Sequence, residues 1–374
     1  MLLALRAIGE ERSFDVALII GDGQASEGLE SLADKIVHLR SNRSIARKIW
    51  RQVTLRTGNA DPRQAEYEQQ IQSTVDVLFP VFSTDEFAGC RRIFWIPDFQ
   101  HRYLPEFFSA EEVSGRDITY ARIAQQATTL VQSSHAAAAD CIKFYPDAQG
   151  KIEVLQFCSV PKDEWYGDTK PVLEKYAAPR RFAIVCNQFW MHKNHGVVFE
   201  AIARLKSQGI TVPLVCTGGT SDYRDKENAY FKSLQHRIET LGIQQQVSIL
   251  GLVPRLDQLH LLRSASVLIQ PSRFEGWSTV LEDARVFGKR VVASAIDVHR
   301  EQNLEGATYF NADRPEELSE RLQEAWMETD LPAMPNPQHE TRCRADANKR
   351  VLAYGRRISH IVEAELSKPA STTK

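Results

Sequence analysis

The sequence predicts an α/β fold in two domains, and three observations support this. With 374 residues, the chain is longer than one hydrophobic core usually serves. Short apolar runs alternate with amphipathic helical stretches, which is typical of a parallel sheet covered by helices on both faces. A segment rich in charge, proline and aromatic residues, 161–179, interrupts the series. We therefore predict an N-terminal domain over residues 1–178, ending in this linker, and a C-terminal domain over residues 179–340.

Three strands are predicted in the N-terminal domain, at residues 15–20, 92–96 and 128–132. Ser134 follows the third strand and is a suitable N-cap for the next helix. Residues 2–9 have the pattern of the second half of a helix, whereas a doubly wound domain normally opens with a strand and a glycine-rich turn. The sequence therefore predicts that this domain lacks its first strand. Either a longer protein continues upstream of Met1, or the domain has dispensed with that strand.

The C-terminal domain shows a regular alternation of strands and helices after Pro179. Strands are predicted at residues 182–186, 213–216, 246–250, 266–270 and 290–294. Helices are predicted between them, at residues 195–207, 226–241, 256–264 and 278–287. Beyond this series, residues 341–367 have the pattern of an amphipathic helix. The alternation predicts a parallel sheet whose ligands bind at the carboxyl ends of its strands.

Composition and charge exclude several classes of protein. The formal net charge is −2, so no overall field favours nucleic acid, and no nucleic-acid-binding motif is present. No apolar run approaches the roughly 18 residues that a membrane helix needs, and the N-terminus lacks the apolar segment of a signal peptide. The six cysteines are scattered, without the spacing of a metal site. We therefore predict a cytoplasmic protein with reduced thiols and no bound metal.

The segment 270–284 carries the strongest indication of chemistry. A buried strand ends at its first residue, a turn follows, and a helix is predicted to begin near Ser278. Glu275 is therefore expected at the carboxyl edge of a parallel sheet, where open α/β folds bind ligands. A carboxylate beside phosphate would repel it, so we expect Glu275 to hold sugar hydroxyl groups. The backbone amides at the start of the helix suit a phosphate, and they belong to Gly276, Trp277, Ser278 and Thr279.

This segment resembles the acidic motif of the retaining glycosyltransferases of family 4, in which seven residues separate two glutamates. Glu275 fits the first position, and the spacing to Gly288 puts Asp283 at the second, with Glu282 next to it. The resemblance implies that the second acid holds the ribose of a nucleotide, and this role falls to Asp283 or to Glu282. An acid that complements a helix dipole is the alternative interpretation, but it does not account for the strand, the glycine and the aromatic residues together.

A second match follows the strand at 182–186. In this loop the family carries an arginine and, five residues later, a lysine, both on the donor diphosphate; Gln188 and Lys193 stand at these positions. A lysine there would neutralise the charge that builds on the departing diphosphate. Gln188 adds no charge, so this site should be less positive than in similar enzymes. The alternative for Lys193 is an exposed loop cation, which is the usual location of lysines.

The resemblance implies further contacts with the donor or the acceptor. Gly218 and Gly219 resemble the family's glycine turn near the nucleotide, although a plain turn accounts for such a pair almost as well. Val253, in the turn after the strand at 246–250, is implied to meet the base through its backbone. In the N-terminal domain Asp98 and His101 follow a strand, and in similar enzymes a His or Asp on this side touches the donor sugar or the acceptor. His101 can equally be a structural histidine, bonded inside the core.

Residues 35–56 hold seven cations and no acid. With isoleucines and a tryptophan between them, these residues suit peripheral contact with anionic lipid at the inner face of a membrane. A solvated helix face is an equally good interpretation.

The resemblance implies the GT-B fold, two Rossmann-like domains facing across a cleft, with the helix at 341–367 packing back on the first domain. It implies an enzyme of cell-surface polysaccharide biosynthesis. This enzyme would move a hexose from a nucleoside-diphosphate sugar to a hydroxyl acceptor, a glycan or a lipid-linked saccharide, with retention of configuration. No Asp-x-Asp triplet occurs, so we expect no metal or other cofactor. Two alternatives stay open: a sugar-nucleotide epimerase of similar fold, which the acidic motif disfavours, and a degenerate nucleotide-sugar-binding or partner protein, which the missing strand and Gln188 favour.

Overall fold

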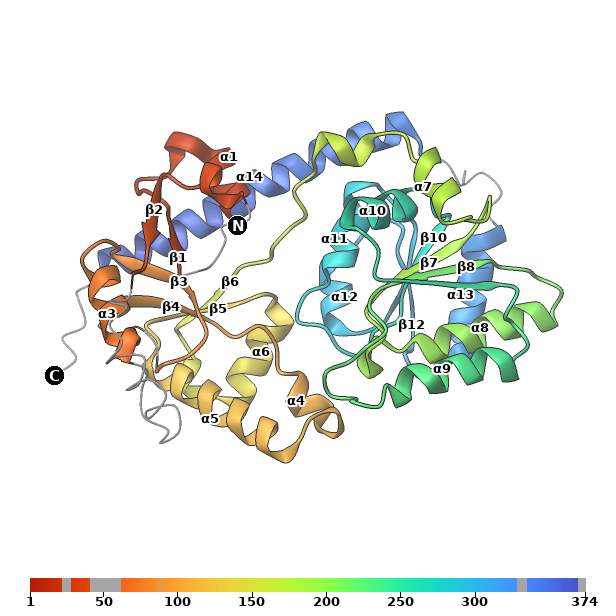
Figure 1. The fold of residues 1–374 in the computed structure, drawn as a ribbon, viewed down its shortest axis with the longest axis horizontal. Coiled ribbons are helices and arrows are strands. Elements are labelled where there is room, and N and C mark those ends of the chain that lie inside the picture. The colour runs from red at the N-terminus through yellow and green to blue at the C-terminus, as the bar shows by residue number, and fades with distance from the viewer. Residues whose placement is uncertain (22–27, 41–61, 86, 88, 328–334, 369–374) are drawn as a thin grey trace.

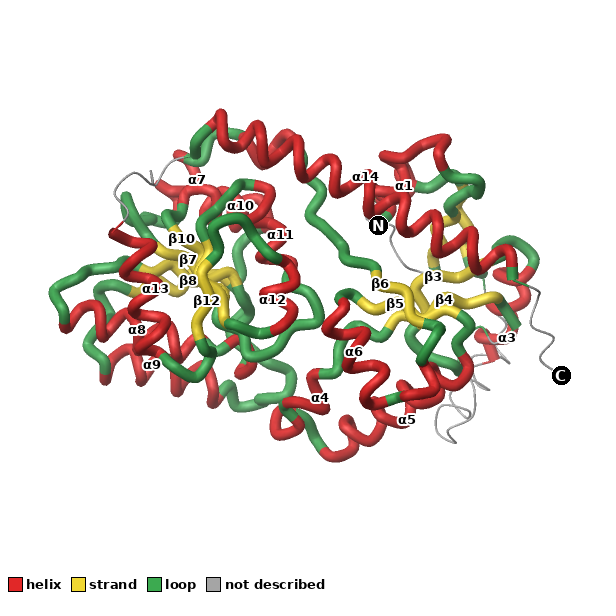
Figure 2. The backbone as a smooth tube through the Cα atoms, turned by 180° about the vertical axis from the view of Figure 1, so that it is seen from behind, coloured by secondary structure: helices red, strands yellow, loops and turns green. Residues whose placement is uncertain are grey.

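The computed structural model describes residues 1–21, 28–40, 62–85, 87, 89–327 and 335–368. These residues form two lobes, and the long helix α14 runs along one side of both (Figure 1). Figure 2 shows strands at the centre of each lobe, with helices around them, and the strands pair in parallel. The expected α/β architecture of two sheet-containing halves is therefore confirmed.

The C-terminal lobe contains a six-stranded parallel sheet in the order β12-β11-β10-β7-β8-β9, which is the doubly wound order. Its four central strands are buried along their whole length, as expected for parallel strands covered on both faces. The strands are β7 (Ala183–Cys186), β8 (Leu214–Thr217), β9 (Val247–Gly251), β10 (Val267–Gln270), β11 (Val291–Ser294) and β12 (Thr308–Phe310). The helices are α8 (His195–Ser207), α9 (Ala229–Thr240), α10 (Arg255–Ser264), α11 (Thr279–Val286), α12 (Asp297–Gln302) and α13 (Pro315–Met327).

The N-terminal lobe contains two parallel sheets. β3 (Val77–Val81), β4 (Arg91–Trp95), β5 (Thr129–Gln132) and β6 (Ile152–Val154) pair in this order, and β1 (Ala17–Ile20) pairs with β2 (Lys35–His38). Within the described residues, no ladder joins β1 to β3. In the doubly wound order 3-2-1-4-5-6 the first strand lies between the second and the fourth. The break between β1 and β3 falls at the place of that strand.

Helices cover both faces of the four-stranded sheet in this lobe. One face packs on α3 (Pro62–Gln72), α5 (Ala110–Gln126) and α6 (His135–Phe144), and the short α4 (Gln100–Tyr103) follows β4. The other face packs on α1 (Leu2–Ile8) and α14 (Pro337–Ser367). Ser134 caps α6 as predicted, since its hydroxyl accepts a hydrogen bond from the backbone N–H of Ala137.

The sequence pattern does not predict β2, β3 or β6. Pro80 interrupts the pattern of β3, and β6 has only three residues, so neither shows a clear alternation. β2 covers the start of the basic stretch at 35–56, so residues 35–38 belong to a sheet and not to a helix face that could lie on a membrane. Residues 41–56 of that stretch lie outside the described residues.

The segment expected as a linker packs on the C-terminal lobe. Residues 163–166 and α7 (Lys170–Lys175) pack against α10, and Trp165 is buried in the same core cluster as Phe182. The chain therefore crosses between the lobes before Asp163, and the expected boundary at 178/179 lies too far along the chain. The aromatic residues of the segment, which suggested a linker, bury apolar surface against the lobe that follows.

Helix α14 packs on both lobes in turn. Near its start, Glu340 forms a buried ion pair with Arg263 of α10, with Nε–Oε1 2.7 Å. Further along, Val351 and Ile358 pack in a core cluster with α1. Gly355 allows α1 to approach closely, because a Cβ at this position would lie 2.4 Å from the carbonyl oxygen of Ala4.

Candidate functional site

The carboxyl ends of β7 and β10 bring together two of the residues predicted to be catalytic. Lys193 ends a short turn after β7, and Glu275 lies in the turn between β10 and α11. The Nζ of Lys193 donates a hydrogen bond to Oε1 of Glu275 at 2.7 Å. The side chains are only 15% and 10% exposed, so water screens their attraction weakly. They form a partly buried ion pair at the ligand-binding edge of the sheet.

Glu275 is held in its charged form. Burial by itself would raise the pKa of Glu275, but the Lys193 ammonium, together with hydrogen bonds from Lys193 and Ser272, outweighs it, so that this pKa lies below its ordinary value. The residue is therefore a carboxylate at neutral pH, and a carboxylate accepts hydrogen bonds without donating any. Sugar hydroxyl groups are donors that fit this requirement.

Buried histidines lie near the ion pair but carry no charge at neutral pH. Burial lowers the pKa of His192 to about 4 and that of His195 to about 3. Burial also lowers the pKa of His299 to about 4. Lys193 therefore supplies the positive charge beside Glu275, and the neutral imidazoles fill the surrounding space.

The start of α11 differs from the expected phosphate site. The Ser278 side chain is the N-cap and accepts a bond from the backbone N–H of Leu281. The backbone N–H of Ser278 donates to the Gln302 side chain at 3.2 Å, so this amide is occupied within the protein. The Trp277 indole donates to the carbonyl of Phe157 at 2.8 Å, and the ring is buried against the segment that crosses between the lobes. Thr279 is exposed at the first turn, and Gly276 lines the cavity described below.

The two candidate second acids point to different neighbours. Asp283 Oδ1 accepts bonds from Arg255 and from the Ser159 hydroxyl, both at 2.6 Å. Burial raises the pKa of Asp283, although the Arg255 guanidinium opposes this shift. Glu282 instead pairs with Arg350 of α14 and Arg285 at 3.3 and 3.4 Å. Asp283 therefore lies on the side of the interlobe segment and of the α10 N-terminus, whereas Glu282 is bound to α14.

The loops after β7, β8 and β9 are joined by short hydrogen bonds. Gln188 Oε1 accepts from the backbone N–H of Gly219 at 2.6 Å. Gly218 has φ +138°, and a Cβ there would lie 2.1 Å from the carbonyl oxygen of Asn187, so only glycine fits. Its backbone N–H donates to the carbonyl of Gly251, which precedes the turn that holds Val253. The three loops therefore form one connected rim beside the ion pair.

A cavity of about 450 Å³ lies between the lobes and adjoins Glu275 and Gly276. On the side of the N-terminal lobe it is lined by Asp98, Tyr103 and Asp140 among others. The Tyr103 hydroxyl donates to Asp140. Asp98 thus faces the same space as Glu275. This is the arrangement expected of a site that holds one ligand between two domains.

His101 does not share this space. Its ring is fully buried, its Nε2 lies 2.9 Å from Asp117 Oδ1, and it packs edge-on against Tyr120. Burial lowers the pKa of His101, although Asp117 opposes the shift. The structure favours the structural alternative for this histidine over a role in contacting a sugar.

The sequence pattern does not single out several residues that the structure places at the site. Gln270 and Asn187 lie at strand ends beneath Glu275, and Arg255 binds Asp283. Glu301 of α12 accepts hydrogen bonds from the backbone N–H groups of His135 and Ala136 at the start of α6 in the other lobe, at 2.7 and 2.9 Å. Of these residues, Gln270 is the one that the sequence could have indicated, because a polar residue at the end of an otherwise apolar strand needs a hydrogen-bond partner.

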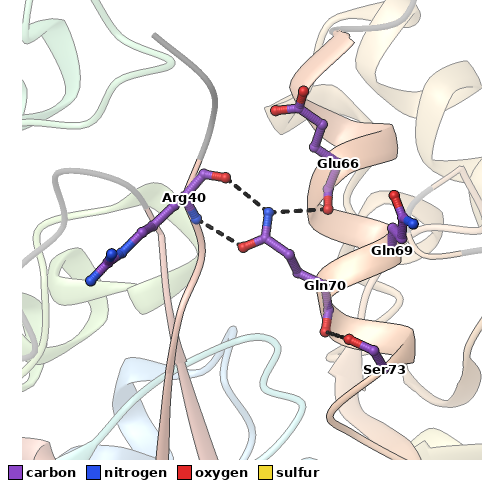
Figure 3. Close-up of a pocket in the computed structure, with 5 residues that line it drawn as sticks. All are labelled: Arg40, Glu66, Gln69, Gln70 and Ser73. Carbon is purple, nitrogen blue, oxygen red and sulfur yellow. Dashed lines mark hydrogen bonds between the residues drawn. The ribbon is translucent and has the colours of Figure 1, made fainter.

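A second hollow, of about 470 Å³, lies at the edge of the N-terminal lobe (Figure 3). It is lined by Arg40, by residues of α3 and by Ser73, and none of these is a candidate site residue. The Gln70 amide accepts from the backbone N–H of Arg40 at 3.0 Å and donates to its carbonyl at 2.8 Å. These bonds satisfy the backbone of Arg40, just beyond β2.

No three His, Cys, Asp or Glu side chains of the described residues are grouped as a metal ion would require. No helix within those residues combines the length and the apolar character needed to span a bilayer.

Comparison with known families gives one match. Residues 172–342 match the model described as Glycosyl transferases group 1, and this range includes Lys193, Glu275 and Asp283. The C-terminal lobe is thus a domain of this group. The comparison with curated protein sequences gives no match.

Three solved structures are similar to nearly the whole chain. The structure of Anabaena HepE in complex with UDP-glucose has a TM-score of 0.69 and 17% identity, and covers 97% of this chain and 95% of that chain. Sucrose-phosphate synthase of Thermosynechococcus elongatus has a TM-score of 0.68 and 12% identity, with 97% and 91% covered. WaaG, a glycosyltransferase involved in lipopolysaccharide biosynthesis, has a TM-score of 0.60 and 15% identity, with 96% and 95% covered. The shared architecture is the GT-B fold.

Proposed function

We propose that this protein transfers a hexose from a nucleoside-diphosphate sugar to a hydroxyl acceptor, with retention of anomeric configuration and without a metal. The observation that carries the proposal is the ion pair of Lys193 and Glu275, located where a doubly wound sheet binds its ligand and next to an interlobe cavity. The match of residues 172–342 to a glycosyltransferase group supports it.

In this proposal Glu275 orients the sugar and Lys193 stabilises the leaving group. The carboxylate accepts hydrogen bonds from sugar hydroxyl groups. The Lys193 ammonium has three N–H donors, of which one is used by Glu275, so the others can reach the diphosphate. Charge builds on the diphosphate as the glycosidic bond to the sugar breaks, and a cation already in place stabilises that charge without reorganisation. A metal ion is then unnecessary for this step.

The remaining candidates have supporting roles. Asp283 would bind the ribose, the backbone at Gly218, Gly219 and Val253 would border the nucleotide, and Gln188 would donate a neutral hydrogen bond to the diphosphate. Asp98 would contact a sugar from the N-terminal lobe. Closure of the lobes excludes water, which favours transfer over hydrolysis.

Uridine diphosphate sugars are the first donors to test, because the similar HepE structures contain UDP, UDP with glucose, or UDP-glucose. The acceptor, a glycan or lipid-linked saccharide of a cell-surface polysaccharide, stays a prediction. So does a cytoplasmic location with peripheral contact to the inner face of the membrane.

A second candidate is a binding protein without transfer activity. Gln188, which offers no charge, and the break between β1 and β3 favour it. The epimerase alternative has no such structural support.

The deciding experiment measures melting temperature with a panel of nucleoside-diphosphate sugars, since a ligand that binds the folded state raises it. Each sugar that stabilises the protein is then incubated with saccharide acceptors, and the product anomer is determined by NMR. Retained configuration supports the proposal. Stabilisation without transfer or hydrolysis supports the binding protein, and inverted configuration refutes retention.

A further inference from the structure

A glutamine is buried beneath Glu275. Gln270 is the last residue of the central strand β10, is fully buried, and follows three apolar residues. An amide buried without partners is destabilising, and an aliphatic residue would suit a central parallel strand better. The Gln270 side chain therefore needs specific partners in this place.

Those partners are residues of the candidate site. Nε2 of Gln270 lies 3.0 Å from Glu275 Oε1 and 3.1 Å from the Ser278 hydroxyl. On the opposite side, Nδ2 of Asn187 donates to Oε1 of Gln270 at 2.7 Å. The amide thus connects the end of β7 with the turn that carries Glu275 and with the N-cap of α11.

The orientation of this amide is fixed by its neighbours. Asn187 offers an N–H, so it requires the carbonyl oxygen of Gln270, and the amide nitrogen then faces Glu275. The reversed orientation would place two acceptors, an amide oxygen and a carboxylate oxygen, against each other. Gln270 can therefore act toward Glu275 only as a hydrogen-bond donor.

Gln270 and Lys193 donate to the same carboxylate oxygen. Both bind Oε1 of Glu275, at 3.0 and 2.7 Å, which leaves Oε2 clear of these two donors, and the Ser272 hydroxyl is a further hydrogen-bond partner of the carboxylate. Two donors on one oxygen fix the rotation of the carboxylate. We infer that Gln270 is a positioning residue, held by Asn187, that orients Glu275 so that Oε2 meets the hydroxyl groups of the donor sugar. This inference rests on the proposed function.

Two variants of Gln270 test the inference. Gln270→Met keeps the size of the side chain and removes the donor. We expect kcat for sugar transfer to fall about 10- to 100-fold, the effect of losing a hydrogen bond to a charged group, with a smaller change in the donor KM. Gln246→Met is the matched control. Gln246 is also buried, but it precedes β9, which is an edge strand of the same sheet.

In Gln270→Glu, the pH dependence of kcat tests the positioning role, because a purely structural role of Gln270 would not change it. Two carboxylates at this distance cannot both be ionised, so the pair keeps one proton to a higher pH than an isolated glutamate. While that proton is present, it forms a hydrogen bond to Glu275 in place of the amide. We therefore expect the kcat of Gln270→Glu to fall as the pH rises and to recover on acidification, in contrast to the wild type and Gln246→Met.

The outcomes separate this inference from the proposed function. If the wild type transfers sugar and folded Gln270→Met keeps its kcat, or Gln270→Glu follows the wild-type pH profile, Gln270 does not position Glu275 and the proposed function is unaffected. If the wild type neither binds nor transfers any nucleotide sugar, both are wrong. Should Gln270→Met fail to fold, the pH profile of Gln270→Glu decides.

Discussion

Gly276 of the C-terminal lobe packs directly against Pro97 of the N-terminal lobe: a Cβ at residue 276 would lie 2.3 Å from the carbonyl oxygen of Pro97. The lobes can approach this closely only because residue 276 has no side chain. We predict that Gly276→Ala keeps each lobe folded but prevents full closure, so that transfer falls at least about 100-fold, as expected when reacting groups are displaced by about 1 Å.

Small-angle X-ray scattering with the donor bound would show a larger radius of gyration for Gly276→Ala than for the wild type. Gly115→Ala is the control, because the added Cβ meets no atom within 4 Å on helix α5. Equal activity of Gly276→Ala and the wild type would show that this contact is not needed in catalysis.

Loss of either member of the ion pair should lower both turnover and stability. Lys193→Met leaves the Glu275 carboxylate without its cation, and Glu275→Gln leaves the ammonium without its anion. Removing one partner of a buried pair costs about 3–5 kcal/mol. The double variant Lys193→Met/Glu275→Gln should recover much of this stability while staying inactive. Thermal unfolding and transfer assays on the same samples check both points, and an active double variant would contradict the assigned roles.

The same pair gives a dependence of stability on pH. The lowered pKa of Glu275 means that its charged form stabilises the folded state above the ordinary glutamate pKa of about 4.3, and that this contribution is lost as the pH falls through the lowered value. The difference in the free energy of unfolding between wild type and Glu275→Gln should therefore shrink on acidification below about pH 4. Chemical denaturation at several pH values measures it, and a difference that grows in acid would refute the interpretation.

Substitutions of Asp283 and Glu282 should have different effects, the first on nucleotide affinity and the second on stability. Asp283→Asn is expected to weaken the affinity for a nucleoside diphosphate about tenfold or more, because a charged hydrogen bond to a ribose hydroxyl contributes about 1.5–3 kcal/mol. Glu282→Gln is expected to lower the melting temperature with little change in affinity, because Glu282 binds Arg350 and Arg285. Calorimetric titration with UDP compares the two. The reverse order would assign the ribose to Glu282.

Glu301 should favour the closed arrangement of the lobes. Its carboxylate accepts two backbone N–H groups at the start of α6, where the helix dipole favours negative charge. Glu301→Ala is expected to increase the protease sensitivity of the segment between the lobes and to lower transfer about tenfold, from the loss of charged hydrogen bonds. Glu305→Ala is the control, since the Glu305 side chain is 84% exposed. Equal digestion of the two variants would argue against a role in closure.

The sequence predicts those parts of the fold that are determined by residues close to one another along the chain. Central strands such as β7 are short apolar runs, and Lys193 and Glu275 are recognisable because each follows such a strand. The Asn187 partner of Gln270 and the Phe157 partner of Trp277 are not predictable in this way. Trp277 binds the carbonyl of Phe157, 120 residues earlier, and only the three-dimensional arrangement brings them together. His101 shows the same limit, because one local sequence fits both a buried and a cleft-facing histidine.

Helix α14 restricts how the two lobes can move. It is one continuous helix of 31 residues, about 47 Å long at 1.5 Å per residue, and it is packed against both lobes. A hinge made of a loop would allow the lobes to separate in any direction. A packed helix on one side permits mainly rotation about an axis near itself, so displacement grows with distance from α14. Opening should therefore be widest on the side away from α14, where α4 lies (Figure 1), and a ligand would enter from that side.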